Sequence, residues 1–320
     1  KDIALKTIEA MKQAGADAVK IQTYTADTMT LDSEKESFVI KQGSIWDGRK
    51  FHDLYKEAYT PWEWHAELKE HSEALGMAFF SSPFDATAVD FLDQLGVPAY
   101  KVASFEITDL PLIEYLAKKG KPVILSTGIA TLADIEAAVS TCRNAGNEHV
   151  TLLKCTSAYP APLEGMNLKM IPVLAQTFGV PVGLSDHTPG SVAAVAAVAL
   201  GACLIEKHFI LDRKLGGPDA SFSMEPAEFA KMVKQVRDTE KTLGNVTWEL
   251  TPAVKKSREF SRSLYASKPI PKGASLTKEN VRCVRPAFGL APKHFTEIIG
   301  RKAAADIAPG TPLRWGLLED

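Results

Sequence analysis

The chain has 320 residues, 45% hydrophobic and 24% charged, with a formal net charge of −2. This composition is typical of a globular protein with a sizeable core, and the near-neutral charge argues against binding to the phosphate backbone of nucleic acids. The longest apolar stretch, residues 192–205, is interrupted by Gly201 and is shorter than the roughly 20 residues of a transmembrane helix, so a membrane partner is not expected.

The cysteines show no pattern of a metal or disulfide framework. The four cysteines are Cys142, Cys155, Cys203 and Cys283, and they form no CxxC pair and no short-range cluster. Neither a zinc ribbon nor a dense set of disulfides is indicated, and a reducing cytoplasm is the expected location.

Helical patterns alternate with short β-rich runs along most of the chain. Residues 1–17 already read as a helix, and seven β-rich runs follow, at 16–23, 77–85, 99–106, 122–128, 150–160, 180–188 and 204–209. Helical patterns between or after them include 61–76, 131–146 and 226–244, each closed by a glycine.

This alternation predicts a parallel sheet covered by helices on its outside. Seven strands after an opening helix indicate an eight-stranded TIM (β/α)8 barrel whose first strand precedes Lys1. A doubly wound nucleotide-binding sheet is the rival, but neither GxGxxG nor GxxxxGK[ST] occurs.

The composition and periodicity of the sequence change after Gly244. Residues 245–260 are polar and linker-like, and residues 261–320 have Pro and Gly punctuation with short β-prone pieces. We therefore predict a catalytic barrel at 1–244, a linker at 245–260 and a small β-rich domain at 261–320.

Two histidines occupy matching positions at the ends of consecutive strands. Because side chains alternate along a strand, Ser185 and His187 share one face, as do Glu206 and His208. Two imidazoles beside a carboxylate suit Mn²⁺, Mg²⁺, Zn²⁺ or Co²⁺, although two ligands alone do not identify the metal. The alternative is that each histidine is a hydrogen-bonded core residue. If His208 points into the barrel, Lys207 should face outward in a structural role.

Three lysines, Lys20, Lys101 and Lys154, each stand near the end of a different strand among serines and threonines. Ammonium groups that converge at the open end of the barrel, where the strands end, repel one another unless an anion lies between them. A phosphate or carboxylate ligand is therefore implied. For any one of them the alternative is an outward-facing side chain. His65, by contrast, lies in a helical pattern and is expected to be an ordinary surface or capping histidine.

Several motifs match one known family in order and spacing: "VKIQTY", "FFSSPFD", "VPAYKVASFEITDLPL", "GKPVILSTG", "LLKCTSAYPAP", "VGLSDHT", "IEKHFILD" and "GGPDASFS". The chain closely resembles the sialic acid synthase family, and the tail "VRPAFGLAP" resembles that family's antifreeze-like (SAF) domain. Within the family, "AYTPWEWH" and "GGPDASFS" are most similar to the pseudaminic acid synthase branch.

The resemblance implies a condensation of phosphoenolpyruvate with an open-chain acylamino sugar, which releases phosphate by C–O cleavage and gives a nine-carbon 2-keto acid. For this branch the sugar is 2,4-diacetamido-2,4,6-trideoxy-altropyranose; the alternatives are the N-acetylneuraminate and legionaminic acid synthases. The implied cofactor is a divalent metal, first Mn²⁺ and otherwise Mg²⁺ or Co²⁺. The implied assembly is a domain-swapped homodimer.

The resemblance also assigns residues. It implies catalytic roles for Lys20, Lys101, Glu106, His187 and His208, with the two histidines as metal ligands. Phosphoenolpyruvate is expected to contact Lys20, Lys101, Ser104, Ser126, Ser157, Tyr159 and Ser185. The sugar is expected near Gln22, Glu106 and Asp219, and near Arg285 from the SAF domain of a partner subunit.

The family normally begins with a strand similar to "AEIGxNHNG", whose glutamate is implicated in catalysis. This sequence begins after that motif, and we expect the working protein to contain it. Two other functions stay open: a class I aldolase with a Schiff base on Lys154 or Lys101, and a non-catalytic sugar-binding protein.

Overall fold

The computed structural model describes residues 1–41, 43 and 45–319. The chain divides into two compact units, Lys1–Gly244 and Asn245–Asp320, and each is described by itself.

The first unit is built on one parallel sheet. Its strands are β1 (Ala18–Thr23), β2 (Ala78–Pro83), β3 (Tyr100–Val102), β4 (Val123–Ser126), β5 (Val150–Cys155), β6 (Val182–Asp186) and β7 (Ile205–Lys207). They lie side by side in chain order, and every neighbouring pair is parallel. This arrangement confirms the predicted α/β fold of the TIM-barrel type.

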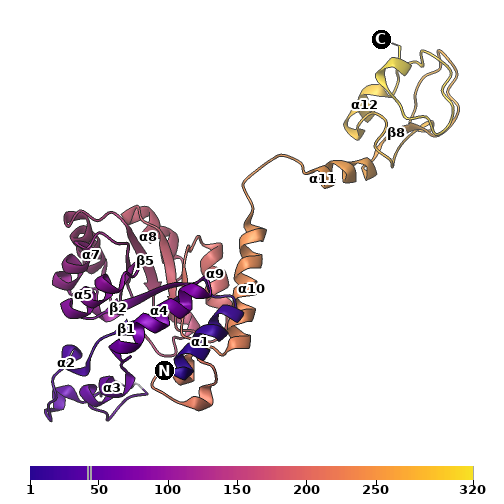
Figure 1. Cartoon of the computed structure of the whole chain (residues 1–320). Helices are drawn as coiled ribbons and strands as arrows, with labels where there is room; N and C mark the ends of the chain where they lie inside the picture. Colours follow the sequence, from indigo (N-terminus) through magenta and orange to yellow (C-terminus); the bar gives the residue numbers. More distant parts are fainter. Residues whose placement is uncertain (42, 44, 320) are drawn as a thin grey trace. The chain divides into compact units, whose positions relative to one another are not determined.

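Helices connect the strands and lie around the outside of the sheet (Figure 1). They are α1 (Asp2–Gln13), α4 (His65–Ala74), α5 (Ala86–Leu95), α6 (Leu110–Ala117), α7 (Leu132–Asn144), α8 (Met170–Phe178), α9 (Val192–Ala199) and α10 (Pro226–Leu243), with the short α2 (Ala26–Met29) and α3 (Phe51–Ala58) after β1. The side chains of Asp85, Asp109 and Thr131 cap α5, α6 and α7 by accepting backbone N–H groups. Among the described residues, none of the helices combines the length and apolar character needed to cross a bilayer.

The register of the sheet decides which side chains face inward. Cys155 pairs with Ser185, and Ser185 pairs with Glu206, so these three residues point to the same face. On the opposite face, Asp186 pairs with Lys207. The face that carries Glu206 is the inner one, because the other face packs against the surrounding helices.

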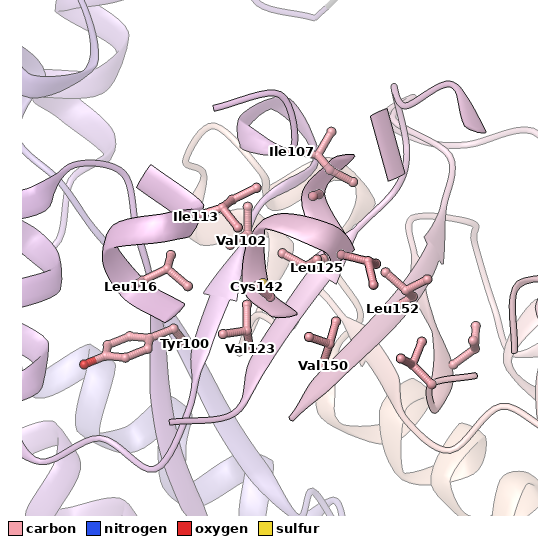
Figure 2. Packing of buried hydrophobic residues seen from close by; sticks show 14 of the residues in the cluster. Tyr100, Val102, Ile107, Ile113, Leu116, Val123, Leu125, Cys142, Val150 and Leu152 are labelled. Atoms are coloured by element: carbon pink, nitrogen blue, oxygen red, sulfur yellow. The ribbon is translucent and has the colours of Figure 1, made fainter. Parts of the chain in front are cut away.

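The outer face of β3, β4 and β5 forms the main core, shown in Figure 2. Tyr100, Val123 and Leu152 from the strands are fully buried there. They pack in one cluster with Ile113 of α6 and Cys142 of α7. This apolar packing holds the strands in place, so polar side chains can occupy the inner strand ends.

A cavity of about 360 Å³ lies between the two edge strands, β1 and β7. Its walls include Lys20 and Glu206 together with apolar side chains such as Met11, Phe80 and Phe229. In the part of the chain that the structure describes, no strand pairs with the outer edges of β1 and β7. The expected strand before Lys1 therefore stays a prediction.

The second unit contains a two-stranded antiparallel sheet, β8 (Ser263–Ala266) with β9 (Val281–Val284), and the short helices α11 (Pro252–Ser257) and α12 (Phe295–Ile298). Its separate core is formed by buried aliphatic residues that include Leu264, Ile270, Leu276, Val281 and Leu313. Helix α11 lies within residues 245–260, which the sequence analysis took as linker, because Thr251 caps it and Pro252 starts it.

Candidate active site

The two histidines predicted at matching strand ends do meet. His187 directly follows β6 and His208 directly follows β7, and their ring centroids are 5.3 Å apart. A single ion held about 2 Å from one nitrogen of each ring fits this spacing. The pair is therefore suited to share one divalent ion.

Hydrogen bonding orients the ring of His187. Its Nδ1 lies 3.1 Å from the carbonyl oxygen of Thr156. Since a carbonyl only accepts, Nδ1 carries the proton and Nε2 presents its lone pair, which is the tautomer that a metal ligand needs.

The protonation of the two rings differs. Burial lowers the pKa of His208 to about 3, so this ring is neutral at pH 7. Burial also lowers the pKa of His187, but the nearby Cys155 thiol, the Thr156 carbonyl and the Glu206 carboxylate outweigh it, and the net pKa is raised. An ion would therefore displace a proton from His187 more often than from His208.

Aromatic rings surround the histidines. Tyr159 lies 4.4 Å from His187 and Phe222 lies 5.0 Å from His208, measured between ring centroids. The Asp219 carboxylate is 3.5 Å from Nδ1 of His208. Among the described residues, no group of three His, Cys, Asp or Glu side chains is arranged to hold a metal, so water or substrate oxygen atoms would complete the coordination.

Two of the three predicted lysines converge on the inner face. The Nζ atom of Lys101 donates to Ser126 Oγ at 2.6 Å and to the carbonyl of Val102 at 2.8 Å, and burial lowers the pKa of Lys101 to about 8. The Nζ atom of Lys20 is 3.4 Å from Glu206 Oε1. Burial raises the pKa of Glu206, but the ammonium groups of Lys101 and Lys20 outweigh it and lower the net pKa.

The expectation that the side chain of Lys154 faces inward with those of Lys20 and Lys101 is wrong. Cys155 faces inward, 4.0 Å from Nδ1 of His187, so the preceding residue must face outward. There Lys154 donates to the carbonyl of Cys155 and to Thr156 Oγ1. Lys101 is thus the remaining inner lysine of the two considered for a Schiff base.

Serine hydroxyls form a narrow cradle around Gly128. The backbone N–H of Gly128 donates to Ser104 Oγ at 2.6 Å. A Cβ atom at Gly128 would lie 2.1 Å from Ser157 Oγ and 2.4 Å from Ser104 Oγ, so only glycine permits this approach. Ser104 and Ser157 therefore converge, and Ser126 joins them through its hydrogen bond to Lys101. Hydroxyl, amide and ammonium donors in one place suit an anionic oxygen.

Two buried oxygen atoms among the described residues lack a hydrogen-bond partner, Glu106 Oε2 and Ser82 Oγ. Burial raises the pKa of Glu106 to about 7. Ser82 pairs in register with Gln22, so both face inward beside Lys20 and its partner Phe80. Unpaired buried polar atoms are costly, so a ligand or an ordered water would have to supply their partners.

The remaining predicted residues divide between the units. Ser185 Oγ donates to Glu206 Oε1 at 3.4 Å, a long contact on the inner face. Asp219 and Tyr159 lie beside the histidine pair. Arg285 belongs to the second unit, directly after β9, where its side chain is exposed.

Sequence reasoning placed Glu206 beside the histidines but did not assign site roles to Ser82, Cys155, Trp46 or Phe222. Trp46 donates from its indole nitrogen to the carbonyl of Pro218 at 3.1 Å and lies 5.8 Å from the ring of Tyr159. The available signal was strand alternation: in "SSPF" and "KCTS" only every second residue reaches the inner face. No local pattern pointed to Trp46 or Phe222.

The chain is similar to known proteins over both units. Residues 7–247 match the NeuB family and residues 261–319 match the SAF domain. A Campylobacter jejuni protein named pseudaminic acid synthase is 49% identical over 98% of this chain and 92% of its own length. A Helicobacter pylori protein of the same name is 46% identical over 98% of this chain and 92% of its own length.

A solved structure gives a similar result. The crystal structure of N-acetylneuraminic acid (sialic acid) synthetase from Leptospira borgpetersenii in complex with citrate has a TM-score of 0.71 and 33% sequence identity. The match covers 81% of this chain and 85% of that chain. The likeness therefore holds for the backbone as well as the sequence.

Proposed function

The chain belongs to the NeuB family and carries a SAF domain, and from this premise we propose that it is a pseudaminic acid synthase. The reaction joins C3 of phosphoenolpyruvate to the aldehyde carbon of 2,4-diacetamido-2,4,6-trideoxy-altropyranose in its open-chain form. Water adds at C2 of phosphoenolpyruvate, and the C–O bond to phosphate breaks. The products are a nine-carbon 2-keto acid and inorganic phosphate.

One observation carries this proposal: the donors that suit an anion lie on the same inner face as the histidine pair. Lys101, Lys20 and the serines around Gly128 supply positive charge and hydrogen bonds for the phosphate and carboxylate of phosphoenolpyruvate. The high identity to named pseudaminic acid synthases favours this sugar over those of the N-acetylneuraminate and legionaminic acid synthases.

The lysines and serines hold phosphoenolpyruvate and balance its charge. Lys101 is buried and already oriented by Ser126, so little reorganisation is needed when an anionic oxygen arrives. The same donors can stabilise the phosphate as it leaves. Lys20 sits at the more open side of this group and reaches the ligand by moving away from Glu206.

The histidine pair fits a divalent ion by donor type, tautomer and spacing. We propose that His187 and His208 bind Mn²⁺, with Mg²⁺ and Co²⁺ as alternatives. A divalent ion bound there acts as a Lewis acid toward the sugar aldehyde. Tyr159 and Phe222 pack against the two rings.

The carboxylates can stabilise the carbon that becomes cationic and accept a proton during the reaction. When C3 attacks the aldehyde, C2 of phosphoenolpyruvate gains positive charge, which Glu206 on the inner face can stabilise. Glu106 has an unpaired buried oxygen and a pKa of about 7 raised by burial, so it can accept a proton near neutral pH. Gln22 and Asp219 are placed to donate to or accept from the sugar hydroxyl and amide groups.

The test is phosphate release from phosphoenolpyruvate with a panel of altrose-type, bacillosamine-derived and mannosamine sugars in the presence of Mn²⁺. We expect rapid release with the altrose-type sugar. Rapid release with N-acetylmannosamine and none with the altrose-type sugar would contradict the assignment. Full activity after rigorous chelation would contradict the metal role.

We further propose a homodimer in which Arg285 of one subunit binds an acyl group of the sugar in the other subunit's site. A guanidinium that donates to an amide carbonyl suits this task. Arg285→Ala should raise the KM for the sugar far more than the KM for phosphoenolpyruvate. Arg282→Ala, at an exposed position within β9, the strand that Arg285 directly follows, is the matched control. Equal changes in both KM values would contradict the proposal.

We also place the protein in the cytoplasm, because phosphoenolpyruvate is a cytoplasmic metabolite and the cysteine pattern is that of a reducing compartment. Fractionation of cells that express the protein, with a periplasmic marker as control, checks this location.

A further inference from the structure

A second charged group lies behind the histidine pair, on the outer face of the same two strands. The Nζ atom of Lys207 donates to Asp186 Oδ2 at 2.6 Å and to the carbonyl of Gly190 at 3.0 Å, and it also donates to the carbonyl of Thr188. All three hydrogen atoms of the ammonium group are therefore used.

Asp186 is equally well satisfied. Its Oδ1 accepts both the backbone N–H and the hydroxyl of Thr188, each at 2.8 Å, while Oδ2 takes the bond from Lys207. The exposed fractions of the Lys207 and Asp186 side chains are 1% and 0%. We call this closed set of side chains, Asp186, Thr188 and Lys207, the 186–207 clamp.

Every member of the clamp is next to a histidine of the site in the chain. Asp186 and Thr188 flank His187, and Lys207 precedes His208. Asp186 and Lys207 are paired in register at the ends of β6 and β7, where the two histidines leave the sheet. The clamp therefore ties together the two points from which the imidazole rings project.

Folding stability does not explain why these positions carry charges. Two charges taken out of water regain their desolvation cost at best, and a well-packed apolar pair is often as stable or more stable. On the same outer face Leu184, two residues before Asp186, is fully buried. An apolar pair has no preferred orientation. Hydrogen bonds do have one, and here they hold both strand ends and the 188–190 turn in one geometry.

We propose that the 186–207 clamp fixes the spacing of His187 and His208, and that Asp186, Thr188 and Lys207 are positioning residues for a divalent-ion site. This inference rests on the metal role in the proposed function. Groups hydrogen-bonded directly to metal ligands commonly change metal affinity by about 10- to 100-fold when they are replaced. The clamp acts one step further out, through the backbone next to the two histidines, so we expect an effect near the lower end of that range.

The test is the affinity of the purified full chain for Mn²⁺ alone, measured from the electron paramagnetic resonance signal of free Mn²⁺. The variant Asp186→Asn/Lys207→Met removes both charges together, which avoids leaving one buried charge unpaired. We expect its Mn²⁺ dissociation constant to rise by about 10-fold, with a cooperative urea transition retained. The matched control is Asp90→Asn/Lys119→Met, the same substitutions in a more exposed ion pair. It should bind Mn²⁺ as the unmodified protein does.

Kinetics supply a second readout. The Mn²⁺ concentration for half-maximal activity should rise in the double variant, while kcat at saturating Mn²⁺ and the KM for phosphoenolpyruvate change less than threefold. A purely structural role would instead lower the active fraction and leave the Mn²⁺ dependence of the folded enzyme unchanged. If the double variant does not fold, Thr188→Val keeps both charges and removes one hydrogen bond to Asp186. It should weaken Mn²⁺ binding several-fold.

Three outcomes are distinguishable. Mn²⁺ affinity equal to that of the unmodified protein in the clamp variants overturns the clamp and leaves the proposed function standing. Mn²⁺ binding that persists in His187→Ala/His208→Ala overturns the metal site, and the clamp with it. Weaker Mn²⁺ binding in the clamp variant and loss of binding in His187→Ala/His208→Ala, with the Asp90→Asn/Lys119→Met control unaffected, support the proposal.

Discussion

Two ion pairs on opposite faces of the same sheet show how differently a protein can use charge. On the inner face, Lys20 and Glu206 are 3.4 Å apart, and their side chains are 20% and 17% exposed. On the outer face, Lys207 and Asp186 are 2.6 Å apart, with side chains 1% and 0% exposed. Glu206 and Lys207 are adjacent in the chain, so alternation along a single strand separates the two pairs.

The difference lies in hydrogen-bonding capacity that remains unused. The outer pair uses all three hydrogens of Lys207 and both oxygens of Asp186 within the protein, so it has nothing to offer a ligand. The inner pair is long and partly open to solvent, so a ligand can replace one partner. Exchange of Lys for Met in each pair should therefore separate stability from activity.

The largest effect is expected for Lys207→Met alone. The substitution leaves the Asp186 carboxylate buried beside an apolar side chain, and breaking a buried pair in this way costs about 3–5 kcal/mol of unfolding free energy. Urea unfolding at pH 7 measures it. The addition of Asp186→Asn should recover part of the loss. A single variant as stable as the unmodified protein would mean that the pair is not closed to water.

The same exchange in the inner pair, Lys20→Met, should act on catalysis. We expect kcat/KM for phosphoenolpyruvate to fall by about 10²–10³-fold, as for the loss of one charge-stabilising donor. Unfolding free energy should change by at most about 1 kcal/mol because the pair is partly exposed. Steady-state phosphate release and urea unfolding on one preparation give both values. A large loss of stability without loss of activity would reverse the roles of the two faces.

A smaller, pH-dependent effect is expected at Glu106, whose carboxyl interacts with the ammonium group of Lys101. Its pKa is raised by burial from 4.5 to about 7, so folding favours the protonated carboxyl, and stability is lost as pH rises through this range. Glu106→Gln should therefore raise the unfolding free energy by about 2 kcal/mol at pH 8 and hardly at all at pH 4, while kcat falls. Unfolding curves at both pH values test this, and an equal gain at both would argue against the raised pKa.

The smallest effect is expected for Lys119→Met, in the outward pair with Asp90 at 2.7 Å. These side chains are 24% and 45% exposed, so solvent replaces most of what the pair loses. Neither the melting temperature nor the activity should change measurably. A destabilisation similar to that of Lys207→Met would show that burial does not distinguish the pairs.

Much of the architecture could be predicted from sequence because the signals are local. The alternation of β-rich and helical runs indicates a parallel sheet with outer helices, and polar residues at strand ends mark the edge where chemistry occurs. Ser185, His187, Glu206 and His208 could be paired because they lie at equal positions on consecutive strands. The outward direction predicted for Lys207 followed from the same alternation and is confirmed.

Two predictions about where a side chain faces were wrong, and the first of them depended on a one-residue choice of strand register. Lys154 was grouped with Lys20 and Lys101, but the inward position belongs to Cys155. The prediction that His65 is a surface or capping histidine is wrong: it is fully buried, with Nε2 2.8 Å from Thr23 Oγ1. Its partner comes from a strand 42 positions away, which no local pattern reveals.

The sequence by itself determined the α/β fold class, the strand ends that carry the site and the pairing of the two histidines, since these depend on periodicity within short segments. Only the tertiary structure decided that Cys155 rather than Lys154 faces inward, which oxygen atoms remain unpaired and how Asp186 pairs with Lys207. The reason is physical: burial and hydrogen bonding depend on residues brought together by packing, and these are far apart in the chain.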